Sequence, residues 1–437
     1  MSLRRLLAVC LVTLAVPLAG ATTARADIAP PWCGTKVPDA AENLPANLPG
    51  SFPHIPYYAI GCTLQSIQDR SIGGRMSLEV IGKSALGRDM YLVTINALGT
   101  REQRNGYSRL RDILRRATSD PGRAQSLLRR GDSKVPIFIQ SGIHGNEYEG
   151  VDAAMRAIER LATTPYGSDP EVDALLDHAV VAFNVVQNPD GRVAGMRTNG
   201  NGFDLNRDYI TQSQSETRAS VSVFRKWFPT ELLDLHGYHT PTLVESTTVP
   251  HNPGIEYDMW FKWSQPRSDA NQAGLASEGF GVDRPVNAVP DPAEWIPPGE
   301  TLPQGWDDWG PFYTGQYGQL RGLDGSTVEM CNQTDADCGI GGVAPKYLGR
   351  MGALRAQELV VWSTFDFVLD HRSEMLHDQL EIYRRGVAGE ARPACCPACA
   401  CGRSPREAAS WSSAFPGPTS AARARSFALR RSARSRR

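Results

Sequence analysis

The segment V-P-I-F-I-Q-S-G-I-H-G-N-E, residues 135–147, decides the fold class of this 437-residue chain. Its beginning, 135–139, is a short apolar run typical of a buried strand, and it leads through a glycine to His144 and Glu147. The sequence after Glu147 predicts a helix that runs to about residue 162. A buried strand, a polar loop and a helix in this order form the repeating unit of an α/β sheet.

The same alternation continues on both sides of this segment. Further strands are predicted at 77–81, 90–95, 179–186, 231–235 and 325–329, and helices at 215–226 and 349–385. Residues 107–130 predict a surface helical insertion broken at Pro121, N-P-D-G at 188–191 predicts a turn, and the proline-rich residues 283–310 predict a long loop. We therefore expect a single α/β domain with a mixed, mostly parallel twisted sheet and helices on both faces.

Charge and composition divide the chain into unlike parts. The whole chain carries −1, the first 26 residues carry +3 and residues 386–437 carry +8, so the part between them carries −12. An acidic body argues against nucleic acid as the main partner. The expected organisation is a leader at 1–26, an irregular segment at 27–66, a catalytic domain at 67–385 and a disordered basic tail at 386–437, or a tail produced by a shifted reading frame.

The leader and the cysteines indicate export. Residues 4–5 are two arginines, an apolar stretch of about 13 residues follows, and Ala24-Arg25-Ala26 is a small-residue cleavage site. Such a stretch is too short to span a bilayer, and no later segment is apolar enough, so we expect a secreted protein without a membrane span. The body holds four cysteines, for which we favour the disulfides Cys33–Cys62 and Cys331–Cys338.

Three potential metal ligands stand where predicted strands end. His144 and Glu147, with two residues between them, lie at the entry to a helix, and His236 follows the strand 231–235, 89 residues after Glu147. Two histidines and one glutamate leave a coordination position open, as catalytic zinc sites require. We therefore expect one Zn²⁺ per chain, held by these three side chains.

Several scattered motifs accompany these ligands in a fixed order. N-P-D-G at 188–191, Arg197 and D-L-N-R at 204–207 precede His236, and G-S-T-V-E at 325–329 follows it. Taken together, these residues resemble the zinc carboxypeptidases of the carboxypeptidase A type over roughly residues 75–385. The resemblance implies a carboxypeptidase-like fold and a hydrolase that cleaves the C-terminal peptide bond of peptides with a free carboxylate. We expect it to act as a monomer.

The resemblance also implies a role for individual residues. Glu329 matches the general base and acid, and Arg197 matches the arginine that polarises the scissile carbonyl. Asn206 and Arg207 match the pair that binds the terminal carboxylate of the substrate. Asp204 matches the carboxylate that orients the first zinc histidine.

The resemblance also concerns tyrosines of the substrate pocket. Tyr238, two residues after His236, matches an aromatic residue of the family's binding site. The family's mobile tyrosine has two candidates here, Tyr313 and Tyr317, which both lie closer to Glu329 than the family spacing. Glu149 is interpreted as a charge at a helix start, His54 as an ordinary histidine, and Asp234 as a group that supports His236.

Two other functions remain open at this point. The same zinc site could hydrolyse acyl-amino acids or trim cell-wall peptides, because Asn206, Arg207 and Arg197 require no more than a free carboxylate beside the scissile bond. A non-catalytic binding module on the same fold is the other alternative, since fold alone does not determine function. Turnover of peptides with and without a chelator distinguishes the three.

Overall fold

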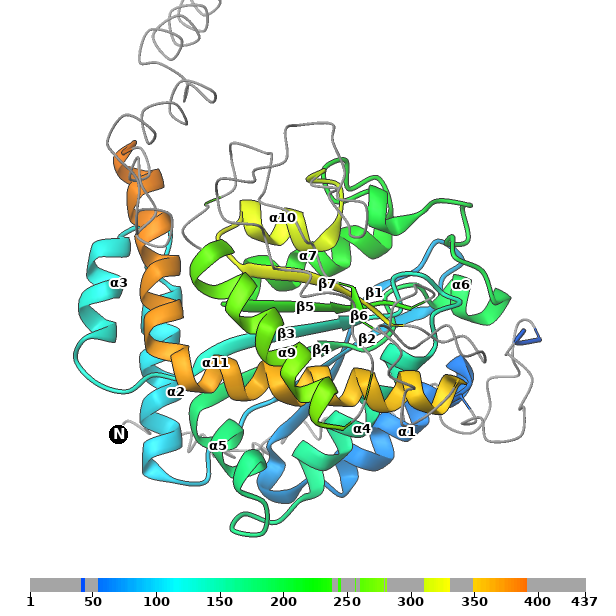
Figure 1. Ribbon diagram of the computed structural model, residues 1–437, viewed down its shortest axis with the longest axis horizontal. Helices are drawn as coiled ribbons and strands as arrows, with labels where there is room; N and C mark the ends of the chain where they lie inside the picture. The colour runs from blue at the N-terminus through cyan, green and yellow to red at the C-terminus, as the bar shows by residue number, and fades with distance from the viewer. Residues whose placement is uncertain are drawn as a thin grey trace, which may run out of the picture.

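The computed structural model describes residues 41–43, 54–237, 243–244, 256, 260–278, 280, 310–330 and 349–390. Within these residues, seven strands form one sheet in the order β1-β2-β4-β3-β5-β7-β6 (Figure 1). The strands are β1 (Met76–Lys83), β2 (Asp89–Ile95), β3 (Val135–Ser141), β4 (Ala179–Asn184), β5 (Glu231–Leu235), β6 (Leu243–Val244) and β7 (Asp324–Met330). The four central strands run parallel, and β1, β2 and β6 join through antiparallel pairings. The predicted mixed sheet is confirmed, with its parallel part at the centre.

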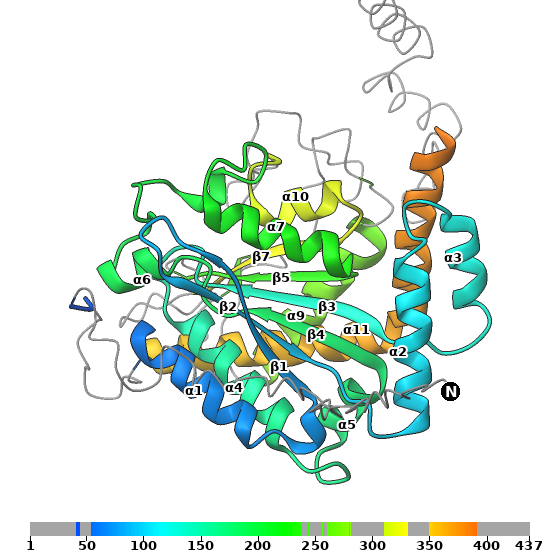
Figure 2. The same cartoon turned by 180° about the vertical axis from the view of Figure 1, so that it is seen from behind.

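Helices cover both faces of this sheet, as predicted (Figure 1). They are α1 (Tyr57–Asp69), α2 (Arg101–Leu114), α3 (Pro121–Leu128), α4 (Glu149–Thr163), α5 (Pro170–His178), α6 (Pro189–Ala194), α7 (Ser215–Trp227), α9 (Gln265–Ser277), α10 (Thr314–Leu320) and α11 (Gly349–Ala388), with short turns η1 (Ile72–Gly74), η2 (Leu205–Arg207) and η3 (Trp260–Ser264). Figure 2 shows the same layers from behind, with α1 and α4 on one side of the sheet and α7 on the other. None of the described helices is long and apolar enough to cross a membrane.

Alternation along β3 divides the interior into two apolar layers. Ile137 and Ile139 pack into the cluster formed with α1, α4 and α11, whereas Phe138 packs into the cluster formed with α7 and Tyr317 of α10. Because both faces of β3 are covered, every residue of this strand is buried, which explains its nearly continuous apolar sequence. Burial of each large apolar side chain contributes about 1.5–3 kcal/mol before the entropy of ordering is counted.

Helix α1 overlaps the segment that we expected to be irregular up to residue 66. Ile60 and Leu64 of this helix are buried in the larger core cluster, so the folded unit begins upstream of the predicted boundary at residue 67. The backbone amides of Tyr57 and Tyr58 donate to the carboxylate of Glu42 at 2.7 and 3.0 Å. The helix start is thus stabilised by a residue about 15 positions upstream, which local sequence patterns do not reveal.

The N-P-D-G segment, predicted as a turn, forms the start of the short helix α6. Its proline occupies the first helical position, and the side chain of Asn188 accepts from the amide of Gly191 at 2.8 Å. Helix α6 ends at Gly195, whose φ of +66° is a left-handed conformation that glycine adopts without strain. The predicted turn was therefore wrong in length but right in position.

The arginine-rich insertion is confirmed as two helices separated at Pro121. Helix α2 begins with a capping box between Thr100 and Gln103, and α3 begins with Asp120 as its cap. Helix α3 packs against α2 and against α11, which extends to Ala388, three residues beyond the predicted end. The first three residues of the predicted tail, 386–388, are thus helical. The leader, tail residues 391–437, loop residues 283–309 and the cysteines Cys33, Cys331 and Cys338 lie outside the described residues.

Candidate metal and catalytic centre

The parallel pairing of β3 and β5 brings the two predicted histidine ligands to one edge of the sheet. Ser141 at the end of β3 pairs with Leu235 at the end of β5, so His144 and His236 emerge side by side. The loop that carries His144 needs two glycines. Gly142 has φ +65°, and a Cβ on Gly145 would lie 2.0 Å from the backbone of Gly191 in α6. The loop therefore presses against α6 and turns His144 back toward β5.

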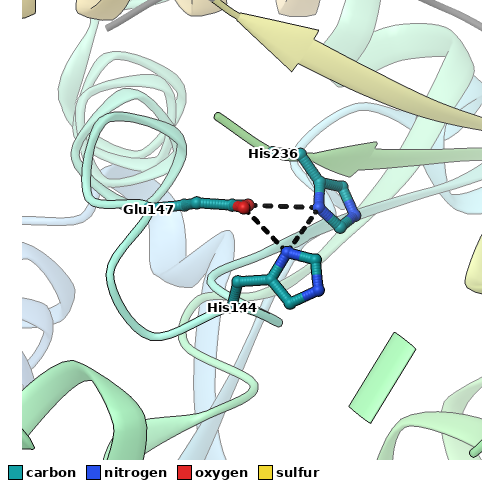
Figure 3. A group of neighbouring side chains, drawn as sticks. All are labelled: His144, Glu147 and His236. Atoms are coloured by element: carbon teal, nitrogen blue, oxygen red, sulfur yellow. Dashed lines mark hydrogen bonds and ion pairs between the residues drawn. The ribbon is translucent and has the colours of Figure 1, made fainter. Parts of the chain in front are cut away.

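His144, Glu147 and His236 converge on one point (Figure 3). One ligand atom from each of the three lies within 4.8 Å of the other two, and all three side chains are buried. Nδ1 of His144 is 2.7 Å from Oε1 of Glu147, and Nδ1 of His236 is 3.1 Å from Oε2 of Glu147. The structure thus brings the three predicted ligands together.

The outer nitrogen of each histidine faces an aspartate. Nε2 of His144 lies 3.1 Å from Oδ1 of Asp204, and Nε2 of His236 lies 2.9 Å from Oδ2 of Asp234. An aspartate that accepts a hydrogen bond there requires the proton on Nε2, which leaves the Nδ1 lone pair of a neutral imidazole directed into the centre. The contact of Asp204 was predicted from the motif, and Asp234 was predicted from its place on the same strand as His236.

The charges in this centre depend strongly on one another. Burial alone would raise the pKa of Glu147, but the two histidines outweigh it and hold that pKa well below its usual range. Burial alone would lower the pKa of His144 and of His236, but the neighbouring carboxylates raise both. Without a metal ion, the site therefore favours a carboxylate that is shared by two protonated imidazoles.

These donors fit a zinc ion. Oε2 of Glu147 is buried and makes no hydrogen bond among the described residues, although it lies 3.1 Å from Nδ1 of His236. Two imidazole nitrogens and one carboxylate oxygen form a donor set that zinc prefers, and their outer atoms are already oriented by aspartates. The residues present therefore match the metal that the sequence predicts.

Glu329 lies beside the three ligands. It comes from β7, and its Oε1 is 3.9 Å from Nδ1 of His236, with 18% of the side chain exposed. Burial is the main cause that raises the pKa of Glu329 to about 7, and the nearby carboxylate of Glu147 adds to it. A carboxyl group with such a pKa can both accept and donate a proton near neutral pH.

Two arginines stand at the exposed rim of the centre. The side chain of Arg197 is 46% exposed, its Nε donates to Asp204 at 3.0 Å, and its NH1 lies 3.8 Å from Glu147. The side chain of Arg207 is 41% exposed, and its guanidinium lies over the ring of Tyr313, 4.3 Å from the ring centre. Both guanidinium groups therefore have surface available for a substrate.

The side chain of Asn206 holds part of the fold together, in addition to the substrate-binding role that the motif predicts. It is buried, and its Oδ1 accepts from the amide of Thr314 at 2.9 Å and from the hydroxyl of Thr314 at 3.2 Å. The side chain thus fixes the start of α10 against the loop that carries Arg207. A substrate carboxylate could be bound only through the remaining Nδ2 of Asn206.

The two candidate tyrosines of α10 and its entry are both buried. Tyr317 packs in the core against Tyr209 and Phe224, with ring centroids 5.6 and 6.1 Å apart, so it does not have the position of a mobile capping residue. Tyr313 is 5% exposed and supports Arg207. Tyr238, His239 and His251 lie outside the described residues, so the prediction for Tyr238 stays a prediction.

Glu149 and His54 form a buried pair that sequence reasoning did not predict. Nε2 of His54 lies 3.6 Å from Oε1 of Glu149, and Nδ1 of His54 lies 2.5 Å from Oδ2 of Asp152. Glu149 is therefore more than an exposed charge at the start of α4. Its partner comes from a segment 95 positions upstream, which no local pattern indicates.

A protein-family model matches part of the chain that carries these residues. The family model described as zinc carboxypeptidase matches residues 64–230, which include His144, Glu147, Arg197 and Arg207 but end before His236 and Glu329. The family match thus covers two of the three converging ligands and leaves His236 and Glu329 outside it.

Individual relatives match short stretches. Carboxypeptidase 2 of Trichophyton tonsurans is 26% identical over 113 residues, 26% of this chain and 20% of that protein. Carboxypeptidase D of Homo sapiens is 36% identical over 121 residues, 23% of this chain and 9% of that protein. The matched region thus spans a fifth or less of the length of these relatives.

Two solved structures align with most of the chain at low sequence identity. A metallo-carboxypeptidase from Pseudomonas aeruginosa aligns with a TM-score of 0.48 at 20% identity, covering 72% of this chain and 68% of that chain. Carboxypeptidase A from Helicoverpa armigera aligns with a TM-score of 0.47 at 14% identity, covering 72% and 74%. Residues 64–230 are thus similar to the zinc carboxypeptidase family.

Proposed function

We propose that this protein is a zinc-dependent carboxypeptidase that hydrolyses the C-terminal peptide bond of peptides. The observation that carries the proposal is the convergence of His144, Glu147 and His236 within 4.8 Å, with Glu329 directly beside them. The match of residues 64–230 to the zinc carboxypeptidase family supports the reaction class, and the donor set supports the metal.

His144, Glu147 and His236 would hold one zinc ion. When bound, zinc supplies a Lewis acid that makes a water molecule more acidic and a peptide carbonyl more electrophilic. The two histidines contribute Nδ1, because Asp204 and Asp234 accept from their Nε2 atoms. Glu147 contributes the negative charge that partly balances the ion.

Glu329 would move the proton of the reaction. Its carboxylate takes the proton from the attacking water and delivers it to the nitrogen of the leaving amino acid. Without a metal, burial raises the pKa of Glu329 to about 7, so this carboxyl group can hold or release a proton near neutral pH. A group that remained fully ionised or fully protonated at neutral pH would perform one half poorly.

Arg197 and Arg207 would bind the negative charges of the substrate and of the transition state. Arg197 lies nearer the ligands, 3.8 Å from Glu147, so it is placed to stabilise the oxyanion that develops on the scissile carbonyl. Arg207 is further out and rests on Tyr313, so it is placed to bind the terminal carboxylate, together with Nδ2 of Asn206. This pair would restrict cleavage to the end of a chain.

We also propose that the protein is exported and acts as a monomer on peptides. Residues 1–26 have the pattern of a secretory leader. Cys62 on α1 is disulfide-bonded, which fits an oxidising compartment, and its predicted partner is Cys33. The acidic body argues for peptide rather than nucleic acid substrates.

A panel of short peptides tests the proposal. Purified protein is incubated with matched peptides that end in a free acid or in an amide, with and without a metal chelator, and the products are identified by mass spectrometry. Release of single C-terminal residues from the free acids, lost in chelator and restored by Zn²⁺, is expected. Internal cleavage, or equal cleavage of acids and amides, would contradict exopeptidase action.

A further inference from the structure

A row of polar side chains crosses the buried centre of the sheet beneath the candidate metal site. Asn184, Gln140, Asp234 and Thr327 are paired neighbours on β4, β3, β5 and β7, and all four are fully buried. Gln140 and Asp234 lie within strands that are otherwise largely apolar. Buried polar groups cost free energy unless they are hydrogen-bonded, so such a row requires an explanation.

Gln140 is the member of the row with the most hydrogen bonds. Its Nε2 donates to Oδ1 of Asp234 at 3.3 Å and lies 2.9 Å from the hydroxyl of Tyr209, while its Oε1 accepts from Ser220. A flip of this amide would place Oε1 against the carboxylate of Asp234. The negative charge of Asp234 therefore fixes the orientation of the amide.

Asp234 transmits this orientation to the metal ligand. Its Oδ1 accepts from Gln140, and its Oδ2 accepts from Nε2 of His236 at 2.9 Å. Since the two oxygens belong to one rigid carboxylate, the bond to Gln140 fixes the plane in which Nε2–H of His236 is accepted. The backbone of His236 is held independently, because its amide donates to Val328 and its carbonyl accepts from Gln357. What remains to be set is the rotation of the imidazole ring.

Tyr209 connects the same glutamine to the loop that carries the substrate-binding arginines. It is fully buried and lies two residues after Arg207, and its hydroxyl also accepts from Nε2 of Gln187 at 3.0 Å. Its backbone amide donates to Phe312, next to Tyr313, on which Arg207 rests. Gln140 is thus hydrogen-bonded to Asp234, which orients the metal ligand His236, and to Tyr209, which anchors the loop that carries Arg207.

We infer that Gln140 is a positioning residue. It holds Asp234, and through Asp234 the ring of His236, at a fixed position relative to the loop 204–209. The inference rests on the proposed function, because it assumes that His236 binds zinc. Among the described residues, the hydrogen bonds of Gln140 go to Asp234, Tyr209 and Ser220, and none goes to a metal ligand or to Glu329 or Arg197. Its effect should therefore appear in metal affinity and ligand geometry.

The test compares Gln140→Met with Gln187→Met. Both changes replace a buried glutamine by an unbranched side chain of similar length, and both remove a hydrogen bond to Tyr209, but only Gln140 contacts Asp234. Zn²⁺ affinity is measured by competition with a chromophoric chelator, and the visible absorption of the Co²⁺-substituted proteins reports ligand geometry. Melting temperatures of the metal-free proteins report general destabilisation.

Gln140→Met is expected to weaken Zn²⁺ binding by about 10-fold and to change the Co²⁺ spectrum, within the range seen for groups that orient metal ligands. Gln187→Met is expected to change the affinity by less than about 3-fold and to leave the spectrum unchanged. Asp234→Asn, which keeps the shape but loses the charge, should weaken binding by about 10–100-fold and serves if Gln140→Met does not fold.

Three outcomes are distinguishable. If the unaltered protein binds no zinc, the proposed metal centre is wrong. If it binds zinc and Gln140→Met binds equally well with the same Co²⁺ spectrum, the positioning role is wrong. Equal losses in Gln140→Met and Gln187→Met would also overturn it, because they would assign the effect to Tyr209 and the core rather than to Asp234.

Discussion

Nδ1 of His144 and Nδ1 of His236 face each other at 3.2 Å, in the buried space that Glu147 closes. Each ring is turned there by an aspartate on its other nitrogen. Two lone pairs held this close repel each other unless a cation or a proton lies between them. In the metal-free centre, protons on the two imidazoles take the place of that cation, and a divalent cation that replaces them should stabilise the fold.

The first prediction concerns metal content and its link to stability. The unaltered protein should contain about one zinc ion per chain, and a chelator should lower its melting temperature, because a ligand present at 100 times its Kd stabilises the fold by about 2.7 kcal/mol. His144→Ala should lose the zinc and the response to chelator. Elemental analysis and thermal melts with and without chelator measure both effects.

His377→Ala is the matched control, since His377 is a half-exposed histidine on α11 far along the chain from the ligands. It should retain the zinc and the response to chelator. Equal metal content in His144→Ala and His377→Ala would contradict the ligand assignment.

The second prediction separates the base from the ligands. Glu329 lies 3.9 Å from His236, whereas Glu147 lies within 3.1 Å of ligand nitrogens of both histidines. Glu329→Gln should therefore retain its zinc and lose about 10²–10⁴-fold in kcat, the usual contribution of general acid–base catalysis. Zinc analysis and steady-state kinetics on one preparation check it. Loss of the metal in this variant would make Glu329 a ligand.

The sequence predicted the positions that depend on one strand and the loop after it. His144 and His236 follow apolar strands, and adjacent parallel strands bring their ends together, so their meeting followed from order alone. Gln140 and Tyr209 could not be found in this way. Their contact requires the sheet register and the path of a loop 69 residues further along. Glu42 could not be found in this way either. It accepts a hydrogen bond from the backbone at the start of α1 only in the folded chain, and no periodicity of the sequence indicates that contact.

The third prediction distinguishes the two arginines. Arg207 is placed to bind the substrate carboxylate in the ground state, so Arg207→Gln should raise KM for free-acid peptides and reduce the preference for acids over amides. Loss of a hydrogen bond to a charged group costs about 1.5–3 kcal/mol, which corresponds to about 10–100-fold in kcat/KM.

Arg197→Gln is the comparison, because Arg197 lies nearer the ligands and should act in the transition state. Its substitution should lower kcat and leave the acid preference intact. Rate measurements on paired acid and amide peptides give both parameters. The assignment is wrong if the two variants show the opposite pattern.

The last prediction concerns a buried lysine at the start of β3. Nζ of Lys134 donates to Asn96 at 3.0 Å and to the carbonyls of Ala97 and Leu176 at 2.9 and 2.8 Å, which ties the end of β2 and the last turn of α5 to β3. Lys134→Met would leave these buried acceptors without a donor, which costs about 1–3 kcal/mol in the free energy of unfolding at pH 7. Urea denaturation measures this loss.

The pH dependence of that loss has a definite sign. Burial lowers the pKa of Lys134 from its ordinary 10.5 to about 8 in the folded protein. Between about pH 8 and 10.5 the unfolded chain thus binds more protons at this residue than the folded protein does, so the lysine contributes more stability as the pH rises. The deficit of Lys134→Met relative to the unaltered protein should therefore be larger at pH 9.5 than at pH 7. All other titrating groups are common to both proteins and cancel in this difference. A deficit that shrinks between these two pH values would mean that the lysine remains protonated in the folded state, with its pKa held up by the three acceptors.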